Sequence, residues 1–178
     1  KLYREWAPRD WVVHEQRIAQ QVFAAGLAAP EPGDIVEIDG RVGLNYERLD
    51  GASMLEAMQR RLFVFASRHA RRLADLHVAM HRQRVPTFVS VKERLRRDIA
   101  QAPGLSSDAR EAVLRRLDML PDADALCHGD FHPGNVLETE RGPIVIDWVT
   151  AGRGPAPADV ARTLLLLSTG RPPGRLAA

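Results

Sequence analysis

A tight loop after one apolar strand, and the hairpin that follows it, constrain the fold more than any other feature of the sequence. The apolar stretch 125–128 leads into the sequence GDFHPGN at 129–135, whose glycines and proline predict a tight turn. Two more apolar stretches follow, separated by turn residues at 139–142, and predict a β-hairpin. Because a hairpin returns the chain to its starting point, Asp147 at its end is expected beside Asn135.

Two carboxylates and one amide would then face the same space. Asp130 follows a strand directly, so its carboxylate can project into a cleft, and Asn135 ends the same loop. Magnesium takes oxygen ligands in proteins. A phosphoryl transfer needs such ligands beside a carboxylate that orients the attacking hydroxyl group. The spacing of Asp130, Asn135 and Asp147 therefore predicts a site fit for one or two magnesium ions.

The remaining sequence predicts an α+β fold in which a helix and a hairpin precede a mainly helical part. Apolar spacing predicts a helix over 12–25, and apolar runs on either side of Asp39-Gly40 predict a hairpin that reaches Leu49. Capping residues or proline predict four further helix starts, at Ser53 with Glu56, at Ser90 with Glu93, at Ser107 and near Pro157. Two helical stripes are expected to face the core: Leu55, Met58, Leu62, Phe65, His69, Leu73, Leu76 and Met80 in one helix, and Val113, Leu114, Leu117 and Leu120 in another.

Together these motifs resemble the aminoglycoside phosphotransferase and choline kinase-like group of small-molecule kinases. The loop of that family reads His-Gly-Asp with an asparagine five residues after the aspartate, as His128 to Asn135 do here. Its magnesium aspartate lies in Ile-Asp-Trp or Ile-Asp-Phe, as Asp147 does. The resemblance implies Asp130 as catalytic base, Asn135 and Asp147 as magnesium ligands, and a protein kinase-like two-lobed fold that uses ATP and magnesium.

The first 50 residues match the family's pattern less tightly. The stretch from Lys1 to Tyr3 is similar to the strand that supplies a phosphate-gripping lysine, and Glu15 to the partner glutamate of that lysine. The alternative is that Lys1 is a frayed end and Glu15 a solvated helix charge. The segment with Glu47 and Leu49 is similar to the linker between the lobes, whose backbone amide and carbonyl would bind adenine. A plain strand end is the other interpretation of that segment.

Four further side chains have expected supporting roles. The resemblance implies that Asp159 braces the catalytic loop, although a carboxylate in a first helical turn is also favoured by the helix dipole. We expect His128 to hold the loop by hydrogen bonds, Trp148 to pack, and Cys127 to be a buried strand thiol.

The resemblance divides the chain into a partial N-terminal nucleotide-binding lobe, residues 1–50, and a mainly helical C-terminal lobe, residues 51–178. The family's glycine-rich loop would precede Lys1 and its acceptor-shaping helices would follow Ala178. The sequence is therefore expected to be truncated at both ends, with weak nucleotide binding and little turnover as it stands. The implied acceptor is a hydroxyl group of a small molecule. An aminoglycoside-type antibiotic is one candidate, beside homoserine, choline, a sugar or a macrolide.

A metal-dependent hydrolase is a second interpretation of the loop. His128, Asp130 and His132 alternate, as ligands of zinc or of a two-metal site could. Such an enzyme needs further ligands, and the other histidines show no paired-ligand motif. His77 and His81 are four residues apart, which permits co-ligation on one helix face, but no glutamate follows His77.

A non-catalytic binding module is the third interpretation. It would use the arginines at positions 60, 61, 68, 71, 72, 82 and 84 to bind nucleic acid or a partner. The leucines and histidines between them instead favour the solvated face of a core helix, so no nucleic-acid partner is expected. An inactive kinase fold is disfavoured because Asp130, Asn135 and Asp147 are all present.

Composition excludes several other classes of protein. No apolar run approaches the roughly 18 residues that span a bilayer, so no membrane partner is expected. A single cysteine, Cys127, rules out an internal disulfide framework and is typical of a reducing compartment, which predicts a cytoplasmic protein. The formal net charge of +2 favours no strongly charged partner. The oligomeric state is not indicated.

Overall fold

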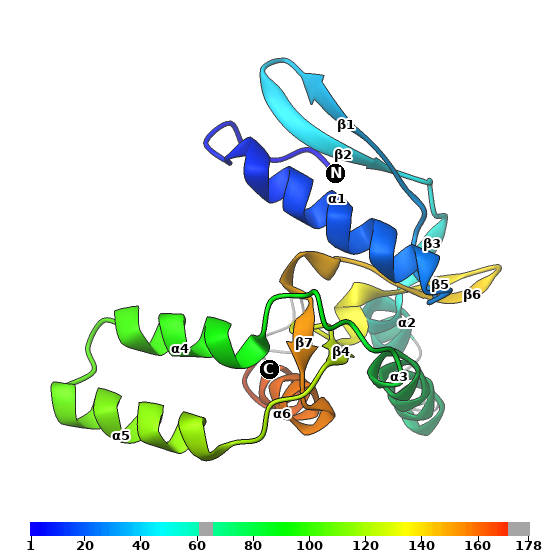
Figure 1. Ribbon diagram of the computed structural model, residues 1–178. Helices are drawn as coiled ribbons and strands as arrows, with labels where there is room; N and C mark the ends of the chain where they lie inside the picture. Colours follow the sequence, from blue (N-terminus) through cyan, green and yellow to red (C-terminus); the bar gives the residue numbers. More distant parts are fainter. Residues whose placement is uncertain (61–65, 171–178) are drawn as a thin grey trace.

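The computed structural model describes residues 1–60 and 66–170, which form an α+β fold with small antiparallel sheets (Figure 1). The α+β class is therefore confirmed. In chain order the elements are α1 (Arg9–Ala24), β1 (Pro32–Ile38), β2 (Arg41–Tyr46), β3 (Gly51–Ser53), α2 (Met54–Arg60), α3 (Ala66–His81), α4 (Val91–Gln101), α5 (Ser107–Met119), β4 (Ala125–Cys127), η1 (Pro133–Asn135), β5 (Val136–Thr139), β6 (Gly142–Val145), η2 (Trp148–Thr150), β7 (Gly152–Gly154) and α6 (Ala156–Thr169).

The first part of the chain is a helix packed beside a hairpin, as the sequence predicts. Strands β1 and β2 pair antiparallel, and their turn has positive φ at Asp39 (51°) and Gly40 (75°), the type I′ geometry that matches strand twist. Lys1 adds an edge to β2: its backbone nitrogen donates to Leu44 O and its carbonyl accepts from Leu44 N, each at 2.8 Å. The Lys1 side chain is thereby fixed beside α1.

Two further sheets position the loop at 129–135. Strands β3, β5 and β6 form one sheet in that order, and β4 pairs with β7 in the other. The hairpin of β5 and β6 is the one predicted around 139–142. Because Tyr46 ends β2 and Gly51 begins β3, residues 47–50 connect the first hairpin to the second sheet.

One apolar cluster joins these elements. It includes Val22 of α1, Met54 of α2, Met80 of α3 and Leu126 of β4, each no more than 2% exposed, together with Phe131 of the loop. The capping box that opens α2 is reciprocal: Ser53 N donates to the Glu56 carboxylate at 2.9 Å, and Glu56 N donates to Ser53 Oγ at 3.2 Å. The predicted core positions Leu62 and Phe65 lie outside the described residues.

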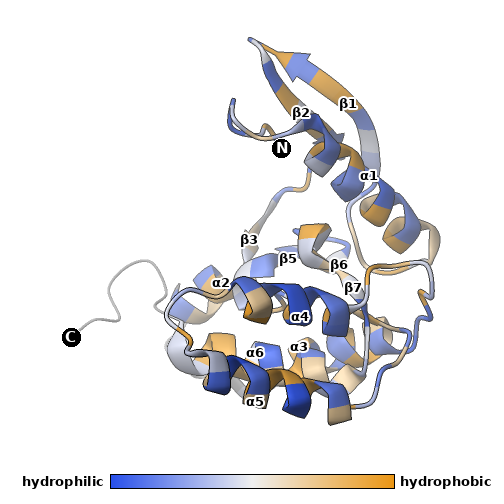
Figure 2. Ribbon diagram, turned by 60° about the vertical axis from the view of Figure 1, so that its left-hand side comes forward, coloured by the Kyte–Doolittle hydropathy of each residue, from blue (hydrophilic) through white to orange (hydrophobic). Residues whose placement is uncertain are grey.

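Helices α4 and α5 depart from the sequence prediction. They extend from the body as a pair (Figure 1) and consist largely of hydrophilic residues (Figure 2), and only Leu117 of α5 is buried. Val113 is 43% exposed and Leu120 49% exposed, so the prediction that both face inward is wrong. The predicted N-cap is also wrong by one residue, because Ser106 Oγ, and not Ser107, accepts from Ala109 N.

Two of the arginines of the binding-module interpretation are paired with carboxylates. Arg72 donates to Glu138 at 2.9 Å, and Arg84 to Asp124 at 2.9 Å. Arg61 lies outside the described residues. These pairings agree with a solvated helix face and leave fewer free cations for nucleic acid. Within residues 1–60 and 66–170, no helix combines the length and apolarity needed to cross a bilayer.

Candidate active site

The turn after β4 places Asp130 at the surface of the core. Gly129 has φ +80°, and a Cβ at this position would lie 2.7 Å from Thr150 O. A side chain is therefore disfavoured both by the backbone conformation and by the close approach of the η2 segment. Asp130 follows with a side chain that is 34% exposed, whereas Phe131 is fully buried. The buried Phe131 side chain fixes the loop to the core, and the neighbouring Asp130 carboxylate remains accessible.

Both ring nitrogens of the buried His128 have partners within the protein. Its Nδ1 accepts from Asp130 N at 3.2 Å, so Nε2 carries the hydrogen and donates to Ile146 O at 3.1 Å. Burial lowers the pKa of His128, which agrees with a neutral ring. The expected role in holding the loop is confirmed by these contacts. The same contacts leave no nitrogen of His128 for a metal, which contradicts the metal cluster of the hydrolase interpretation.

Asn135 directs its amide nitrogen at Asp130. Its Nδ2 donates to Asp130 O at 2.9 Å and to Asp130 Oδ2 at 3.2 Å. Because the amide nitrogen makes both of these contacts, the amide oxygen of Asn135 is available to other groups. The Asn135 carbonyl accepts from Ile146 N at 3.0 Å, so the loop is tied to the residue directly before Asp147. The convergence predicted from the hairpin is therefore present.

Asp147 lies at the end of the hairpin in a left-handed conformation, with φ 64° and ψ 57°. Aspartate tolerates this region better than most residues with a side chain, and such conformations are often found at functional sites. Its Oδ1 accepts from Lys1 Nζ at 2.7 Å across 146 residues of sequence. The side chain is 41% exposed, so Asp147 remains open to solvent beside the lysine.

Glu15 of α1 is a buried carboxylate, 1% exposed, that fixes Lys1. It accepts from Lys1 Nζ at 3.0 and 3.1 Å, from Tyr46 Oη at 2.9 Å and from Tyr3 Oη. Burial alone would lower the pKa of Lys1, but the contacts with Asp147 and Glu15 outweigh it and raise the pKa. Burial and the Glu15 charge likewise raise the pKa of Tyr46, which keeps its hydroxyl group as a donor. The predicted Lys1–Glu15 ion pair is present.

The two tyrosines were not predicted from the sequence. Tyr3 lies two residues after Lys1 on the same extended segment, whose Leu2 forms an isolated bridge with Gly43 of β2, and Tyr46 is the last residue of β2. The period of a strand puts Lys1 and Tyr3 on one face, which is the signal that could have identified Tyr3. No comparable signal marks Tyr46, because its contact with Glu15 depends on how α1 packs against the hairpin.

A cavity of about 380 Å³ brings the predicted cofactor and metal residues together. Its lining residues are Lys1, Glu15, Pro30, Tyr46, Glu47, Leu49, Asn135, Leu137, Ile146 and Asp147. Asp130 is not among them and adjoins the cavity through its contact with Asn135. The lining thus combines charged and polar side chains with the apolar side chains of Leu49, Leu137 and Ile146.

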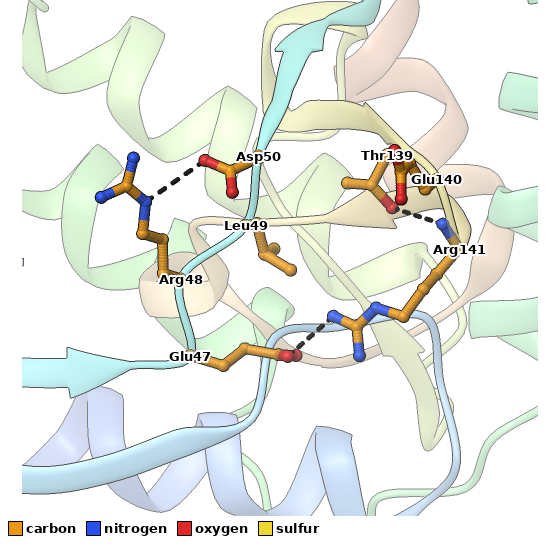
Figure 3. A pocket seen from close by; sticks show the side chains of 7 residues that line it. All are labelled: Glu47, Arg48, Leu49, Asp50, Thr139, Glu140 and Arg141. Carbon is orange, nitrogen blue, oxygen red and sulfur yellow. Dashed lines mark hydrogen bonds and ion pairs between the residues drawn. The ribbon is translucent and has the colours of Figure 1, made fainter.

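A second cavity of about 360 Å³ lies on the linker and shares Glu47 and Leu49 with the first (Figure 3). Glu47 Oε2 accepts from Arg141 Nη2 at 2.7 Å, which joins the linker to the turn between β5 and β6. This contact, with the Glu31 amide, lowers the pKa of Glu47. Glu47 N already donates to Glu31 O at 2.9 Å. Any adenine contact by Glu47 would therefore use its carbonyl.

Asp159 in the first turn of α6 braces the loop from behind. Its Oδ2 accepts from His128 N at 2.9 Å and its Oδ1 from Gly129 N at 2.8 Å. Burial by itself raises the pKa of Asp159, but hydrogen bonds from His77, His81 and these two amides outweigh it and hold the pKa well below its usual range. The carboxylate is therefore charged while it fixes the backbone directly before Asp130. Trp148, 2% exposed, and Cys127, fully buried, pack as expected, and burial raises the pKa of the Cys127 thiol to about 12.

We expect Gly129→Ala to distort the loop and to lower activity more than global stability. The alanine Cβ would meet Thr150 O at 2.7 Å in a left-handed conformation, so the peptide must move and Asp130 with it. Thermal unfolding and steady-state rates measure the two effects. Gly26→Ala is the matched control, because Gly26 also has positive φ (72°) but meets nothing within 4 Å. Equal losses of activity in both variants would contradict the importance of the Gly129 contact.

A lysine–glutamate pair, an aspartate at the end of a hairpin and the loop asparagine line one cavity, and the loop aspartate adjoins it through that asparagine. This architecture is that of a kinase-like phosphotransferase. Residues 5–178 match APH, the phosphotransferase enzyme family, and the chain belongs to that family. The predicted family relationship is confirmed. No curated protein sequence matches the chain.

Three solved structures resemble the fold. A thermostable mutant of aminoglycoside phosphotransferase APH(4)-Ia, in a ternary complex with AMP-PNP and hygromycin B, has a TM-score of 0.64 at 18% identity and is matched over 87% of this chain and 61% of its own. An aminoglycoside-3'-phosphotransferase of type VIII has a TM-score of 0.59 at 21% identity and is matched over 87% of this chain and 64% of its own. Amicoumacin kinase hAmiN, in complex with AMP-PNP, Ca2+ and Ami, has a TM-score of 0.57 at 15% identity and is matched over 93% of this chain and 56% of its own. The chain thus spans less than two thirds of each of these proteins.

Proposed function

We propose that the protein transfers the γ-phosphate of ATP to a hydroxyl group of a small molecule, with magnesium bound by Asn135 and Asp147. The observation that carries this proposal is the single cavity lined by Lys1, Glu15, Asn135 and Asp147, with Asp130 directly behind Asn135. Family membership supports the reaction class, and two of the similar structures hold AMP-PNP. The two parts of the chain act as the lobes on either side of that cavity.

Lys1 supplies the positive charge that the nucleotide phosphates require. Its Nζ lies between the Glu15 and Asp147 carboxylates, at 3.0 and 2.7 Å. Glu15, buried and held by two tyrosines, fixes the position of the ammonium group, and Asp147 lies on the open side. Phosphate oxygens that enter the cavity are attracted to Lys1 and repelled by Asp147. A magnesium ion offsets that repulsion.

The donor set fits magnesium. Asp147 offers a half-exposed carboxylate, and Asn135 offers its amide oxygen because its amide nitrogen is directed at Asp130. Hard oxygen donors in small number, with room for water and phosphate oxygens, are the usual environment of this ion. When bound, magnesium neutralises charge on the transferring phosphoryl group. The residues themselves orient the phosphates and hold them at the edge of the cavity.

Asp130 acts as the base for the acceptor hydroxyl group. Its backbone N–H donates to His128 Nδ1, and its carboxylate accepts from the Asn135 amide, so the side chain is oriented before any substrate arrives. With a third of its surface exposed, it can meet an acceptor that approaches from outside the nucleotide cavity. The hydroxyl proton passes to the Asp130 carboxylate as the oxygen attacks the γ-phosphorus, and the bond from that phosphorus to the bridging oxygen breaks so that ADP leaves.

The linker is proposed to bind the adenine edge through the Glu47 carbonyl and the Leu49 N–H. The Glu47 N–H is taken by Glu31 O, so the carbonyl is the group of Glu47 that remains for this contact. The apolar lining of Leu49, Leu137 and Ile146 would cover the faces of the base. The predicted contribution of Glu47 is thereby narrowed to its carbonyl oxygen.

The acceptor class is proposed from similar structures. Two of them hold hygromycin B or Ami, which are small molecules and not proteins or nucleic acids. An aminoglycoside is one candidate, and homoserine, choline, a sugar or a macrolide are others. The decisive experiment is a screen of ATP consumption with the full-length protein against hydroxylated metabolites and antibiotics, with Asp130→Asn as the blank. Consumption that no acceptor stimulates above that blank would contradict the proposal.

Replacement of Glu15 by glutamine is expected to raise the KM for ATP by about tenfold or more, because Lys1 is no longer held in position for the phosphates. A loss of roughly 1.4 kcal/mol in the free energy of ATP binding suffices for a tenfold change. The variant keeps the shape of the side chain but removes the charge that fixes Lys1 and leaves two tyrosine hydroxyl groups beside a neutral amide. Initial rates over a range of ATP concentrations measure the effect. Glu37→Gln on β1, 63% exposed, is the matched control. An unchanged KM in Glu15→Gln would remove Lys1–Glu15 from the phosphate site.

A further inference from the structure

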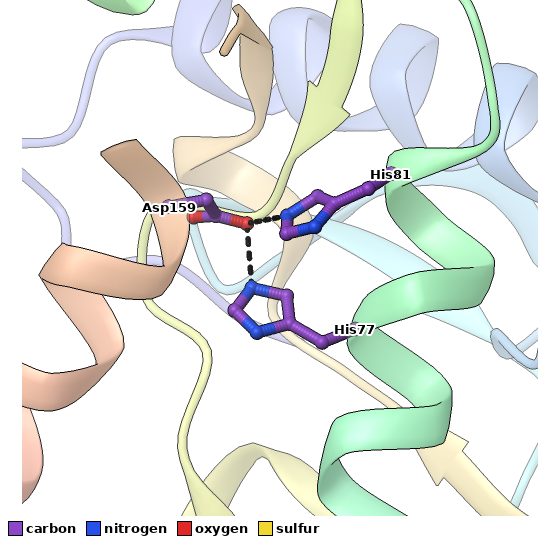
Figure 4. A group of neighbouring side chains, drawn as sticks. All are labelled: His77, His81 and Asp159. Carbon is purple, nitrogen blue, oxygen red and sulfur yellow. Dashed lines mark hydrogen bonds and ion pairs between the residues drawn. The ribbon is translucent and has the colours of Figure 1, made fainter. Parts of the chain in front are cut away.

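Two histidines of α3 and one aspartate of α6 meet behind the catalytic loop (Figure 4). His77 and His81 are one helical turn apart, and their rings lie with centroids 4.2 Å apart at an interplanar angle of 40°. Both direct Nε2 to the same oxygen, Asp159 Oδ2, at 3.0 and 3.2 Å. The three ligand atoms lie within 4.8 Å of one another, and the side chains are 9%, 11% and 1% exposed.

Hydrogen bonding alone supplies one donor too many to that oxygen. Asp159 Oδ2 also accepts from His128 N at 2.9 Å, so three nitrogens surround it, whereas among the described residues Oδ1 accepts from Gly129 N alone. A carboxylate oxygen has two lone pairs. If both imidazoles donate, three hydrogens share two lone pairs; if one does not, a bare nitrogen faces a negatively charged oxygen. A cation between the three atoms removes this conflict, because each imidazole then offers a lone pair to the cation.

The distances and ligand types fit a transition-metal ion of the zinc class. Zinc binds imidazole nitrogen and carboxylate oxygen at about 2.0–2.2 Å in a tetrahedron, so neighbouring ligands lie about 3.3 Å apart. The observed separations of 3.0 and 3.2 Å need little adjustment. Two histidines four residues apart on a helix are a common way to present two ligands to one ion. Magnesium, which prefers oxygen donors in an octahedron, does not suit this set.

We propose that His77, His81 and Asp159 form a binding site for a divalent zinc-class ion that fastens α3 to α6 behind the catalytic loop. The site is separate from the proposed magnesium ligands Asn135 and Asp147. One lone pair of Asp159 Oδ2 would hold the ion, and the contacts of Asp159 with His128 N and Gly129 N would remain. The ion would act as a structural link and takes no part in the proposed phosphoryl transfer.

Metal binding to the tag-free full chain tests the proposal directly. The protein is stripped with a chelator and titrated with zinc, and with cobalt as a spectroscopic probe, in the presence of excess magnesium. We expect one equivalent of zinc to bind with sub-micromolar affinity and to raise the thermal midpoint. The cobalt complex should show the visible bands of a four-coordinate ion, with water as the ligand beyond the three side chains.

The variant His81→Gln separates a ligand from a hydrogen-bond donor, because glutamine retains an N–H group for Asp159 but is a poor zinc ligand. It should lose zinc affinity by more than the roughly 10- to 100-fold that an outer-shell change costs. His14→Gln on the exposed side of α1 and His132→Gln beside Asp130 are controls for adventitious sites and should retain full affinity. Affinity that is weak in the parent protein, or equal in His81→Gln, overturns the proposal in favour of a purely hydrogen-bonded cluster. These measurements do not depend on kinase activity.

Discussion

The Asp130→Asn variant is expected to lose phosphoryl transfer by roughly 10²- to 10⁴-fold, the contribution usual for a positioned base, while it keeps its fold and its affinity for ATP. Asparagine has the same shape and can still accept from the Asn135 amide, so the loop contacts at 2.9 and 3.2 Å need not change. What disappears is the charge that takes up the hydroxyl proton. ATP affinity should remain because Asp130 does not line the nucleotide cavity.

Single-turnover rates with saturating acceptor, combined with calorimetric ATP binding, separate the two effects. Asp75→Asn on the exposed face of α3 is a matched control for loss of one carboxylate. A rate within a few-fold of the parent would remove Asp130 from the role of base. A variant that loses ATP affinity instead would place Asp130 in the nucleotide site, which the cavity does not support.

The loop and the hairpin after it could be predicted because both are local. Gly129, the turn residues at 139–142 and the alternating apolar strands determine the path from Asp130 to Asp147 within 18 residues, with no information needed from the rest of the fold. The contact of Asn135 O with Ile146 N is a direct result of that short hairpin. The functional roles of these residues remain predictions until the variants are measured.

Longer-range contacts were predictable only in part. The Lys1–Glu15 pair followed from resemblance to a family, since nothing in the spacing of 14 residues requires it. The cluster around Asp159 could be predicted only in part. Helical spacing indicates that His77 and His81 share a face, but no local pattern predicts their contact with Asp159, which is 78 residues beyond His81. Its packing against α3 is a property of the tertiary fold.

Helices α4 and α5 show what periodicity leaves undetermined. An apolar stripe indicates which face of a helix is the least polar, but it cannot indicate whether another element covers that face. In α5 only Leu117 is buried, and Val113 remains 43% exposed. The N-cap was misplaced for a related reason, because Ser106 and Ser107 are chemically equal and only the backbone angles distinguish them.

The Asp147→Ala variant should lose the magnesium-dependent part of its ATP binding. In the parent protein, magnesium is expected to raise ATP affinity because it offsets the repulsion between Asp147 and the phosphates. Without this carboxylate the ion has Asn135 as its remaining protein ligand among those proposed. Asp34→Ala on the exposed face of β1 is the control for loss of a carboxylate. Calorimetric titration with ATP, in magnesium and in chelator, measures the effect.

Two structural features make this measurement decisive. Alanine at φ 64° costs about 1–2 kcal/mol of stability, so Asp147→Asn, which tolerates that conformation better, separates loss of stability from loss of the charge on the ligand. Lys1 also loses its contact at 2.7 Å in Asp147→Ala, whereas the amide oxygen in Asp147→Asn can still accept from it. If Asp147 serves only to hold Lys1, Asp147→Ala should bind ATP less well with and without magnesium, and Asp147→Asn should bind it more nearly as the parent does. If it binds the metal, ATP affinity in chelator should be unchanged or higher in Asp147→Asn, because a negative charge near the phosphates is gone. The magnesium-dependent gain should vanish in Asp147→Ala and be reduced in Asp147→Asn.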